Sequence, residues 1–267
     1  MKNRIEQLFQ MLRNEEKSAF IAYICAGDPD ADRCLEIMHA LDKAGVDLIE
    51  LGVPFSDPLA DGIVNQMAAS RALSSGASVA KTLEIIRAFR KDSNTPIVLF
   101  TYLNPIYAYG FKRFHEDASR AGADGILNLD LPPDEESHND ELMQANELLN
   151  IRIIAPNTPA DRMAKIANTG EGFIYYISRE GVTGERSELA TGITQQVAEI
   201  RSHTDLPVVV GFGISTPEHS SAIAAIADGV VVGSAIVNTI ANHSHSDDLY
   251  EQVYHFVKPL VDASKSV

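Results

Sequence analysis

The chain has 267 residues, with 22 basic against 37 acidic side chains, a formal charge of −15, no Trp and two Cys. A chain this acidic gains no affinity for nucleic acid from counterion release and is repelled by anionic lipid, which argues against both as partners. The length suits a single α/β barrel of about 250 residues.

The first segment, residues 1–12, predicts a helix, because its apolar residues fall on one face. These residues are Ile5, Leu8, Phe9 and Leu12. We expect this helix to precede a barrel and to close its bottom; a frayed amphipathic tail is the alternative.

No targeting or membrane segment is visible in the sequence. The first twenty residues hold no uninterrupted apolar region. The longest apolar stretch, about nine residues at 229–237, falls short of the roughly 18 that a membrane span needs. We therefore expect a cytoplasmic location, where Cys25 and Cys34 stay reduced in the core.

Short β-branched runs alternate with helical patterns along the chain. The expected strands are 19–25, 46–51, 97–101, 125–129, 151–155, 173–177, 208–210 and 229–232. Eight strand–helix units require parallel pairing through right-handed crossovers and close into a (β/α)8 TIM barrel, an α/β fold. A doubly wound open sheet also fits, but it more often has a Gly-rich dinucleotide turn after its first strand, where this chain reads AGDP.

The spacing of the units predicts extra elements. Strands 2 and 3 are the farthest apart, which leaves room for a long loop and two helices, and an extra helix is also expected in the eighth unit. No Gly/Ser-rich or Pro-rich linker interrupts the chain, so residues 1–267 are expected to form one barrel domain.

The second strand carries a carboxylate near its end. Side chains alternate along a strand, so Glu50 falls on the same face as Val46 and Leu48. If that face is the barrel interior, burial raises the pKa of Glu50 and suits it to carry a proton near neutral pH. A surface Glu on the helix-facing side is the alternative.

The loop that follows, 52–62, is too apolar and too rich in Pro for an ordinary solvated connector. Asp57 and Asp61 are its only charged residues. Turn formation before Pro58 explains Asp57, whereas Asp61 is placed to reach over the barrel mouth, where barrel enzymes hold their active sites. We therefore favour Asp61 as a functional residue.

Glycines follow the seventh and eighth strands. The segments GFGIS at 211–215 and GSA at 233–235 each precede a predicted helix. Backbone N–H groups beside glycine, a helix N-terminus and the Ser234 hydroxyl together favour an anion. Barrels often build a phosphate site at this position; simple tight turns are the alternative.

The sixth loop, 178–186, is polar and contains two glycines. A loop of this kind over a barrel mouth predicts a lid that opens and closes, with an ordinary disordered surface loop as the alternative.

Lys and His residues fall in expected helices and outer loops rather than at strand ends. Neither a Schiff base nor a metal site is therefore expected. An aldol-type cleavage without either requires a substrate that supplies its own electron sink, and two carboxylates then suffice.

The segment LIELGVPFSDPLADG at 48–62 strongly resembles the signature of the tryptophan synthase α subunit family. Further matching segments are AGDP at 26–29, YLNP at 102–105, DLPP at 130–133, SR with GVTG within 178–184, GFGI at 211–214 and GSAIV at 233–237. The likeness covers nearly the whole chain.

The resemblance implies retro-aldol cleavage of indole-3-glycerol phosphate to indole and glyceraldehyde 3-phosphate. The indole would pass to a β subunit that makes L-tryptophan. The resemblance implies no cofactor in this chain, pyridoxal phosphate in the β subunit, and an αββα assembly. A weakly active chain that mainly activates the β subunit is the alternative.

By the same resemblance, Glu50 matches the acid/base residue and Asp61 the carboxylate that holds the ring N–H. The substrate pocket is matched by Tyr23, Phe100, Leu127, Ile153, Tyr175 and Phe212, the phosphate site by Gly184, Gly213, Gly233 and Ser234, and the lid by Arg179, Gly181 and Thr183. The departures from the family pattern are Tyr23 where Phe is expected, Ile63 where Pro is usual, and Glu180 in place of a small residue.

We expect the loop 53–59 and Asn104-Pro105 to form part of the β-subunit surface. Pro54, Phe55 and Pro58 have no evident reason to be exposed in a monomer unless a partner covers them.

Overall fold

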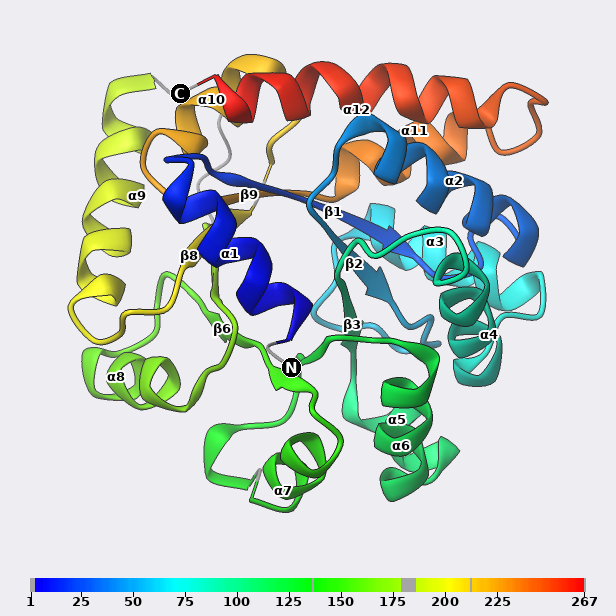
Figure 1. The fold of residues 1–267 in the computed structure, drawn as a ribbon, viewed down its shortest axis with the longest axis horizontal. Helices are drawn as coiled ribbons and strands as arrows, with labels where there is room; N and C mark the ends of the chain where they lie inside the picture. The colour runs from blue at the N-terminus through cyan, green and yellow to red at the C-terminus, as the bar shows by residue number, and fades with distance from the viewer. Residues whose placement is uncertain (1–2, 136, 179–185, 212, 267) are drawn as a thin grey trace.

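The computed structural model describes residues 3–135, 137–178, 186–211 and 213–266. Its strands form one parallel sheet, in the spatial order β5-β4-β3-β2-β1-β9-β8-β7-β6. They are β1 (Ala19–Cys25), β2 (Leu48–Gly52), β3 (Ile97–Thr101), β4 (Gly125–Asn128), β5 (Leu149–Asn150), β6 (Arg152–Ile154), β7 (Ile174–Ile177), β8 (Val208–Gly211) and β9 (Gly229–Val232). The sheet curls into a ring, as Figure 1 shows.

The ring closes because the two end strands of the sheet, β5 and β6, are neighbours in the chain. Only Ile151 separates them: β5 pairs with β4, and β6 pairs with β7. The predicted single strand at 151–155 is therefore wrong in detail: residues 149–150 pair with β4, and residues 152–154 pair with β7. The (β/α)8 barrel itself is confirmed.

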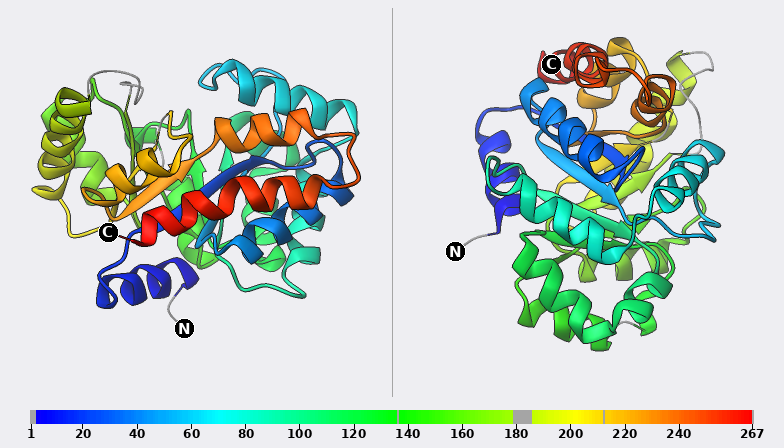
Figure 2. Two further views of the ribbon diagram at one scale, coloured as in Figure 1. Left: turned by 90° about the horizontal axis from the view of Figure 1, so that it is seen from above. Right: turned by 90° about the vertical axis from the view of Figure 1, so that its right-hand side faces the viewer.

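Helices surround the sheet on its outer side, except for the first, which lies across one end of the barrel (Figures 1 and 2). They are α1 (Arg4–Asn14), α2 (Ala31–Ala44), α3 (Ile63–Ser74), α4 (Val79–Phe89), α5 (Leu103–Tyr109), α6 (Phe111–Ala121), α7 (Ser137–Ala145), α8 (Ala160–Thr169), α9 (Arg186–Arg201), α10 (Pro217–Ala224), α11 (Ser234–Asn242) and α12 (Leu249–Lys265), with the 3-10 turn η1 (Pro133–Glu135).

The extra helices occur where the sequence predicts them, and in one further place. The second unit contains α3 and α4, and the eighth contains α11 and α12, as predicted. The third unit also contains two helices, α5 and α6, which the sequence pattern did not reveal. Gly110, with φ at 105°, separates them, and a conformation in the left-handed region ends one helix before the next begins.

Helix α1 closes the amino-terminal end of the barrel, and the alternative of a frayed tail is wrong. Asn3 and Glu6 form a capping box at its start. All four predicted apolar residues are buried, and the rings of Phe9 and Phe173 lie 5.5 Å apart. In Figure 1, α1 crosses the opening of the strand ring.

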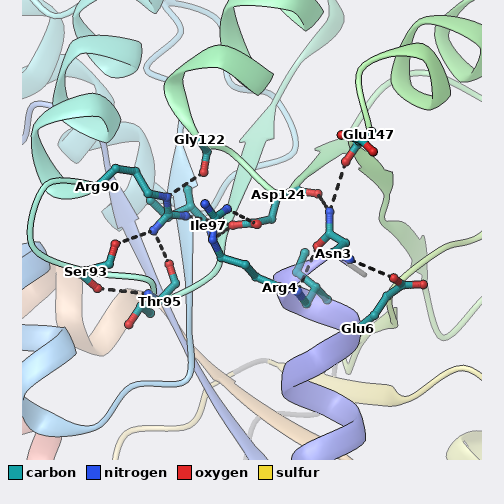
Figure 3. A network of polar contacts seen from close by, with 11 residues as sticks. Asn3, Arg4, Glu6, Arg90, Ser93, Thr95, Ile97, Gly122, Asp124 and Glu147 are labelled. Carbon is teal, nitrogen blue, oxygen red and sulfur yellow. Dashed lines mark hydrogen bonds and ion pairs between the residues drawn. The ribbon is translucent and has the colours of Figure 1, made fainter. Parts of the chain in front are cut away.

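A buried carboxylate holds this end together. Asp124 accepts hydrogen bonds from Arg4 at 2.6 Å, from Arg90 at 2.9 Å and from the backbone N–H of Ile97 at 2.8 Å. Figure 3 shows this network between α1 and the starts of β3 and β4. Because the carboxylate is paired on both oxygens, its burial is compensated, and α1 is fixed to the barrel.

Among the described residues, no helix is long and apolar enough to cross a membrane. Cys25 and Cys34 are both buried and free, as the sequence predicts. Burial raises the pKa of the Cys34 thiol to about 12, so this group is an inert part of the core.

Candidate active site

A cavity of about 350 Å³ opens at the carboxyl ends of the strands, where α/β barrels place their chemistry. It is lined by Tyr23, Glu50, Ala60, Asp61, Gly62, Asn65, Phe100, Tyr175, Ile177, Gly211, Gly213, Ile214, Ser215, Val231, Gly233, Ser234, Ala235 and Asn238. The two predicted carboxylates thus share one cavity with glycines from the seventh and eighth units.

Glu50 projects from β2 into the barrel. Its neighbour on the same face, Leu48, packs in the barrel interior, whereas Ile49 packs beneath the helices. Glu50 is 1% exposed, and among the described residues neither carboxylate oxygen has a hydrogen-bond partner. Burial raises its pKa from 4.5 to about 8, so the resting group is mainly the neutral acid at pH 7. The alternative of a surface Glu is wrong.

Asp61 lies in the loop between β2 and α3 and is held from two sides. The Tyr102 hydroxyl donates to Asp61 Oδ2 at 2.8 Å, and Gln66 Nε2 donates to the Asp61 backbone carbonyl at 2.8 Å. Burial raises the pKa of Asp61, and hydrogen bonds from the side chains of Tyr102 and Asn65 oppose that rise. The carboxylate is therefore oriented toward the cavity but less desolvated than Glu50.

Aromatic rings form the apolar wall. Tyr23 and Phe100 meet edge to face with their centroids 5.1 Å apart. A Cβ atom at Gly52 would lie 2.6 Å from the Tyr23 hydroxyl oxygen, and one at Gly211 would lie 2.5 Å from that of Tyr175. Both phenols thus occupy space that only glycine leaves open, so each ring has a fixed place beside Glu50.

The part of the cavity lined by Gly213, Gly233 and Ser234 suits an anion. Gly213 has φ at 68°, a conformation that favours glycine. Helix α11 starts at Ser234 without a side-chain cap on its first N–H groups. Among the described residues no Lys or Arg lines the cavity, so backbone N–H groups and the helix N-terminus are the groups available to an anion here.

Other predicted site residues lie elsewhere or outside the described residues. Leu127 is fully buried in the barrel interior, and Ile153 borders a separate cavity of about 290 Å³. Neither lines the cavity that holds Glu50; both pack in the interior cluster of the barrel, against which Phe100 and Tyr175 also pack. The predicted residues that lie outside the described part of the chain are Phe212, Gly184, Arg179, Gly181, Thr183 and Glu180.

The structure also brings in residues that the sequence analysis did not single out. They are Asn65, Tyr102, Ile177, Ser215 and Asn238. Asn65 stands four positions after Asp61, in the first turn of α3, and this short separation in sequence was the available signal. Tyr102 reaches Asp61 from the third unit, and no local pattern indicates that contact.

The expected exposure of the loop 53–59 is only partly correct. Pro54 is buried, and Phe55 and Pro58 are half-buried, because the loop folds back on the barrel mouth and the rings of Phe55 and Tyr102 lie 5.4 Å apart. The large apolar residue of this loop that is strongly exposed is Leu59, at 92%. In the third unit Pro105 is buried and Asn104 is exposed.

Comparison with known proteins shows that the chain is similar to members of one family along nearly its whole length. A family model described as "Tryptophan synthase alpha chain" matches residues 9–265. A tryptophan synthase alpha chain of Opitutus terrae is 51% identical over 246 residues, covering 92% of both chains, and one of Desulfatibacillum aliphaticivorans is 45% identical over 261 residues, covering 98% of both. The solved structure of tryptophan synthase subunit alpha from Legionella pneumophila superposes with a TM-score of 0.91 at 36% identity, covering 99% of both chains.

Proposed function

The chain belongs to the tryptophan synthase alpha chain family, and we propose that Glu50 and Asp61 carry out its reaction. Members of this family are carbon–carbon lyases that cleave indole-3-glycerol phosphate to indole and glyceraldehyde 3-phosphate. The observation that carries the proposal is the buried Glu50 carboxyl, which lies in the same cavity as Asp61 and has no hydrogen-bond partner among the described residues. Indole release by the wild-type chain and by Glu50→Gln tests it.

The protonation of Glu50 fits the first step. Its raised pKa supplies a neutral acid, which gives its proton to the third carbon of the indole ring. The ring nitrogen becomes cationic, and Asp61 accepts the hydrogen bond of its N–H and stabilises the charge. The protonated ring is the electron sink that replaces a Schiff base.

The second step returns the proton. Glu50, now ionised, takes the proton of the glycerol hydroxyl next to the ring. The carbon–carbon bond breaks, its electron pair restores the neutral indole, and the hydroxyl carbon becomes the aldehyde of glyceraldehyde 3-phosphate. Glu50 ends as the neutral acid, so one residue serves both steps.

In this proposal the substrate's phosphate lies on the backbone of Gly213 and Gly233 and the Ser234 hydroxyl. Tyr23, Phe100 and Tyr175 enclose the indole ring. The proposed roles of Phe212 and Gly184, and the lid of Arg179, Gly181 and Thr183, stay predictions from the sequence.

The family identity implies a β-subunit partner. We place its contact at the barrel mouth, where Leu59 is 92% exposed, Ile63 69% and Met67 57%. Exposed apolar side chains in one segment are typical of a surface that a partner covers. An αββα assembly, with pyridoxal phosphate in the β subunit, is part of the same proposal.

Two further statements complete it: residues 1–267 act as one barrel domain, and the protein works in the cytoplasm, where its two thiols remain reduced. The alternative of a weakly active chain that mainly activates its partner is not favoured, since both Glu50 and Asp61 are present and share the cavity.

A further inference from the structure

Asn65 presents a buried hydrogen-bond acceptor at the wall of the cavity. It lies in the first turn of α3 and lines the cavity beside Asp61. Among the described residues its Oδ1 atom has no hydrogen-bond partner. A buried acceptor without a partner costs free energy in the empty protein, and a ligand that donates to it recovers that cost.

The contact with Asp61 fixes which half of the amide is unused. A carboxylate can only accept hydrogen bonds, so Asn65 interacts with it through the amide nitrogen. The carbonyl oxygen of Asn65 is therefore the half that remains for a ligand. The same contact sets the orientation of the amide, because the reverse placement would set two oxygens against each other.

The position of Asn65 in the cavity indicates the donor on the ligand. Asn65 hydrogen-bonds the side chain of Asp61, and both residues line the cavity, so their free acceptor oxygens face the same part of a bound ligand. A substrate ring that Asp61 holds, as in the proposed reaction, therefore also lies beside Asn65. The donor that a ring of this class carries is its N–H group.

We propose that Asn65 is a specificity-determining residue whose carbonyl oxygen accepts, together with Asp61, the hydrogen bond of the ring N–H of the substrate. This inference rests on the proposed role of Asp61. Two acceptors, of which one is neutral and preoriented, make the site reject rings that lack the donor. A site with buried polar groups discriminates strongly against a ligand that leaves them unpaired.

The test compares two probes on the full chain by titration calorimetry. Indole-3-propanol phosphate keeps the ring N–H and the phosphate but lacks both glycerol hydroxyls, and its benzofuran counterpart carries oxygen in place of the N–H. The wild type should prefer the indole probe. Asn65→Leu, close in size, and Asn65→Ala should each reduce that preference about 5- to 10-fold, the worth of one hydrogen bond.

Asn238→Leu is the matched control, because it makes the same exchange at another residue lining the cavity, on α11. It should leave the preference for the indole probe unchanged. If the Asn65 variants weaken the binding of both probes equally, the role of Asn65 is merely structural and the inference is overturned. An unchanged preference in both variants would also overturn it.

Asp61→Asn, measured beside these variants, separates this inference from the role of Asp61. If Asp61→Asn reduces the preference and the Asn65 variants do not, the inference fails and the proposed role of Asp61 stands. If only the Asn65 variants reduce it, Asn65 is the acceptor and the role of Asp61 is wrong.

Discussion

The Tyr102 hydroxyl joins two units of the barrel by donating to Asp61 Oδ2 at 2.8 Å while accepting from the Ala60 N–H at 3.0 Å. The two side chains are 41 positions apart, so this pair fixes the end of the β2–α3 loop against the third unit. Asp61 is thus held in place before substrate arrives, which is the arrangement that electrostatic stabilisation of a transition state requires.

Tyr102→Phe should therefore lower kcat by about 10-fold, the effect of one charge-assisted hydrogen bond, while the ring keeps its contact with Phe55. Loss of the bond should also raise the pKa of Asp61, because the Tyr102 hydroxyl lowers it in the wild type. Steady-state kinetics and the pH dependence of kcat measure the two effects. Unchanged kinetics would show that Asp61 needs no anchor.

Asp61→Asn should reduce kcat more than it weakens substrate binding. The ring nitrogen is neutral in the bound substrate and cationic after protonation, so the negative charge of Asp61 acts chiefly in the transition state. Steady-state rates together with calorimetric binding of indole-3-propanol phosphate separate the two. A rise in KM at constant kcat would instead make Asp61 a uniform binding contact.

Glu50 should make the stability of the protein fall as the pH rises from 4.5 to about 8. Its pKa is raised to about 8 in the folded state, so in this range the unfolded chain ionises Glu50 and the folded chain does not. The folded state then binds more protons, and the free energy of unfolding decreases by up to about 1.4 kcal/mol per pH unit.

Glu50→Gln removes this contribution. The free energy of unfolding is measured in urea between pH 5 and 8. The value for Glu50→Gln minus the value for the wild type should increase as the pH rises. Glu36→Gln, an exposed site on α2, is the control and should follow the wild type. A constant difference between Glu50→Gln and the wild type would mean that Glu50 titrates at an ordinary pKa.

Leu59→Asp should weaken binding of a tryptophan synthase β subunit, because it places a charge in an exposed apolar segment at the barrel mouth. Met11→Asp is the control: Met11 is 48% exposed, but it lies on α1 at the opposite end of the barrel. Calorimetry with the purified β subunit should detect a loss for Leu59→Asp alone. If both variants bind the β subunit with equal affinity, the interface does not include Leu59 and lies elsewhere on the chain.

The sequence was sufficient for the parts of the site that depend on local periodicity. Alternation along β2 predicted the inward Glu50, and the paired glycine segments predicted that Gly213 and Gly233 come together at the barrel mouth, because both follow from the direction of a strand and its following helix. The plug formed by α1 was predictable for the same reason, since its apolar face is continuous.

The remaining features depend on contacts between distant segments. The anchoring of Asp61 by Tyr102 requires the second and third units to meet, and the division of β5 from β6 reflects hydrogen bonds to two different neighbours. The burial of Pro54 likewise follows from the way the loop folds back on the mouth. Neither the composition nor the spacing of residues in the sequence indicates such contacts between distant segments.

The most direct test of the central claim is the rate of indole release by Glu50→Gln from indole-3-glycerol phosphate. Gln keeps the size of the side chain but can neither give nor take the proton, so kcat should fall by about 10²–10⁴-fold. Binding of indole-3-propanol phosphate should stay near the wild-type value, and Glu36→Gln should keep full activity. A rate within a few-fold of the wild type would contradict the assignment of Glu50 as the acid and base of this reaction.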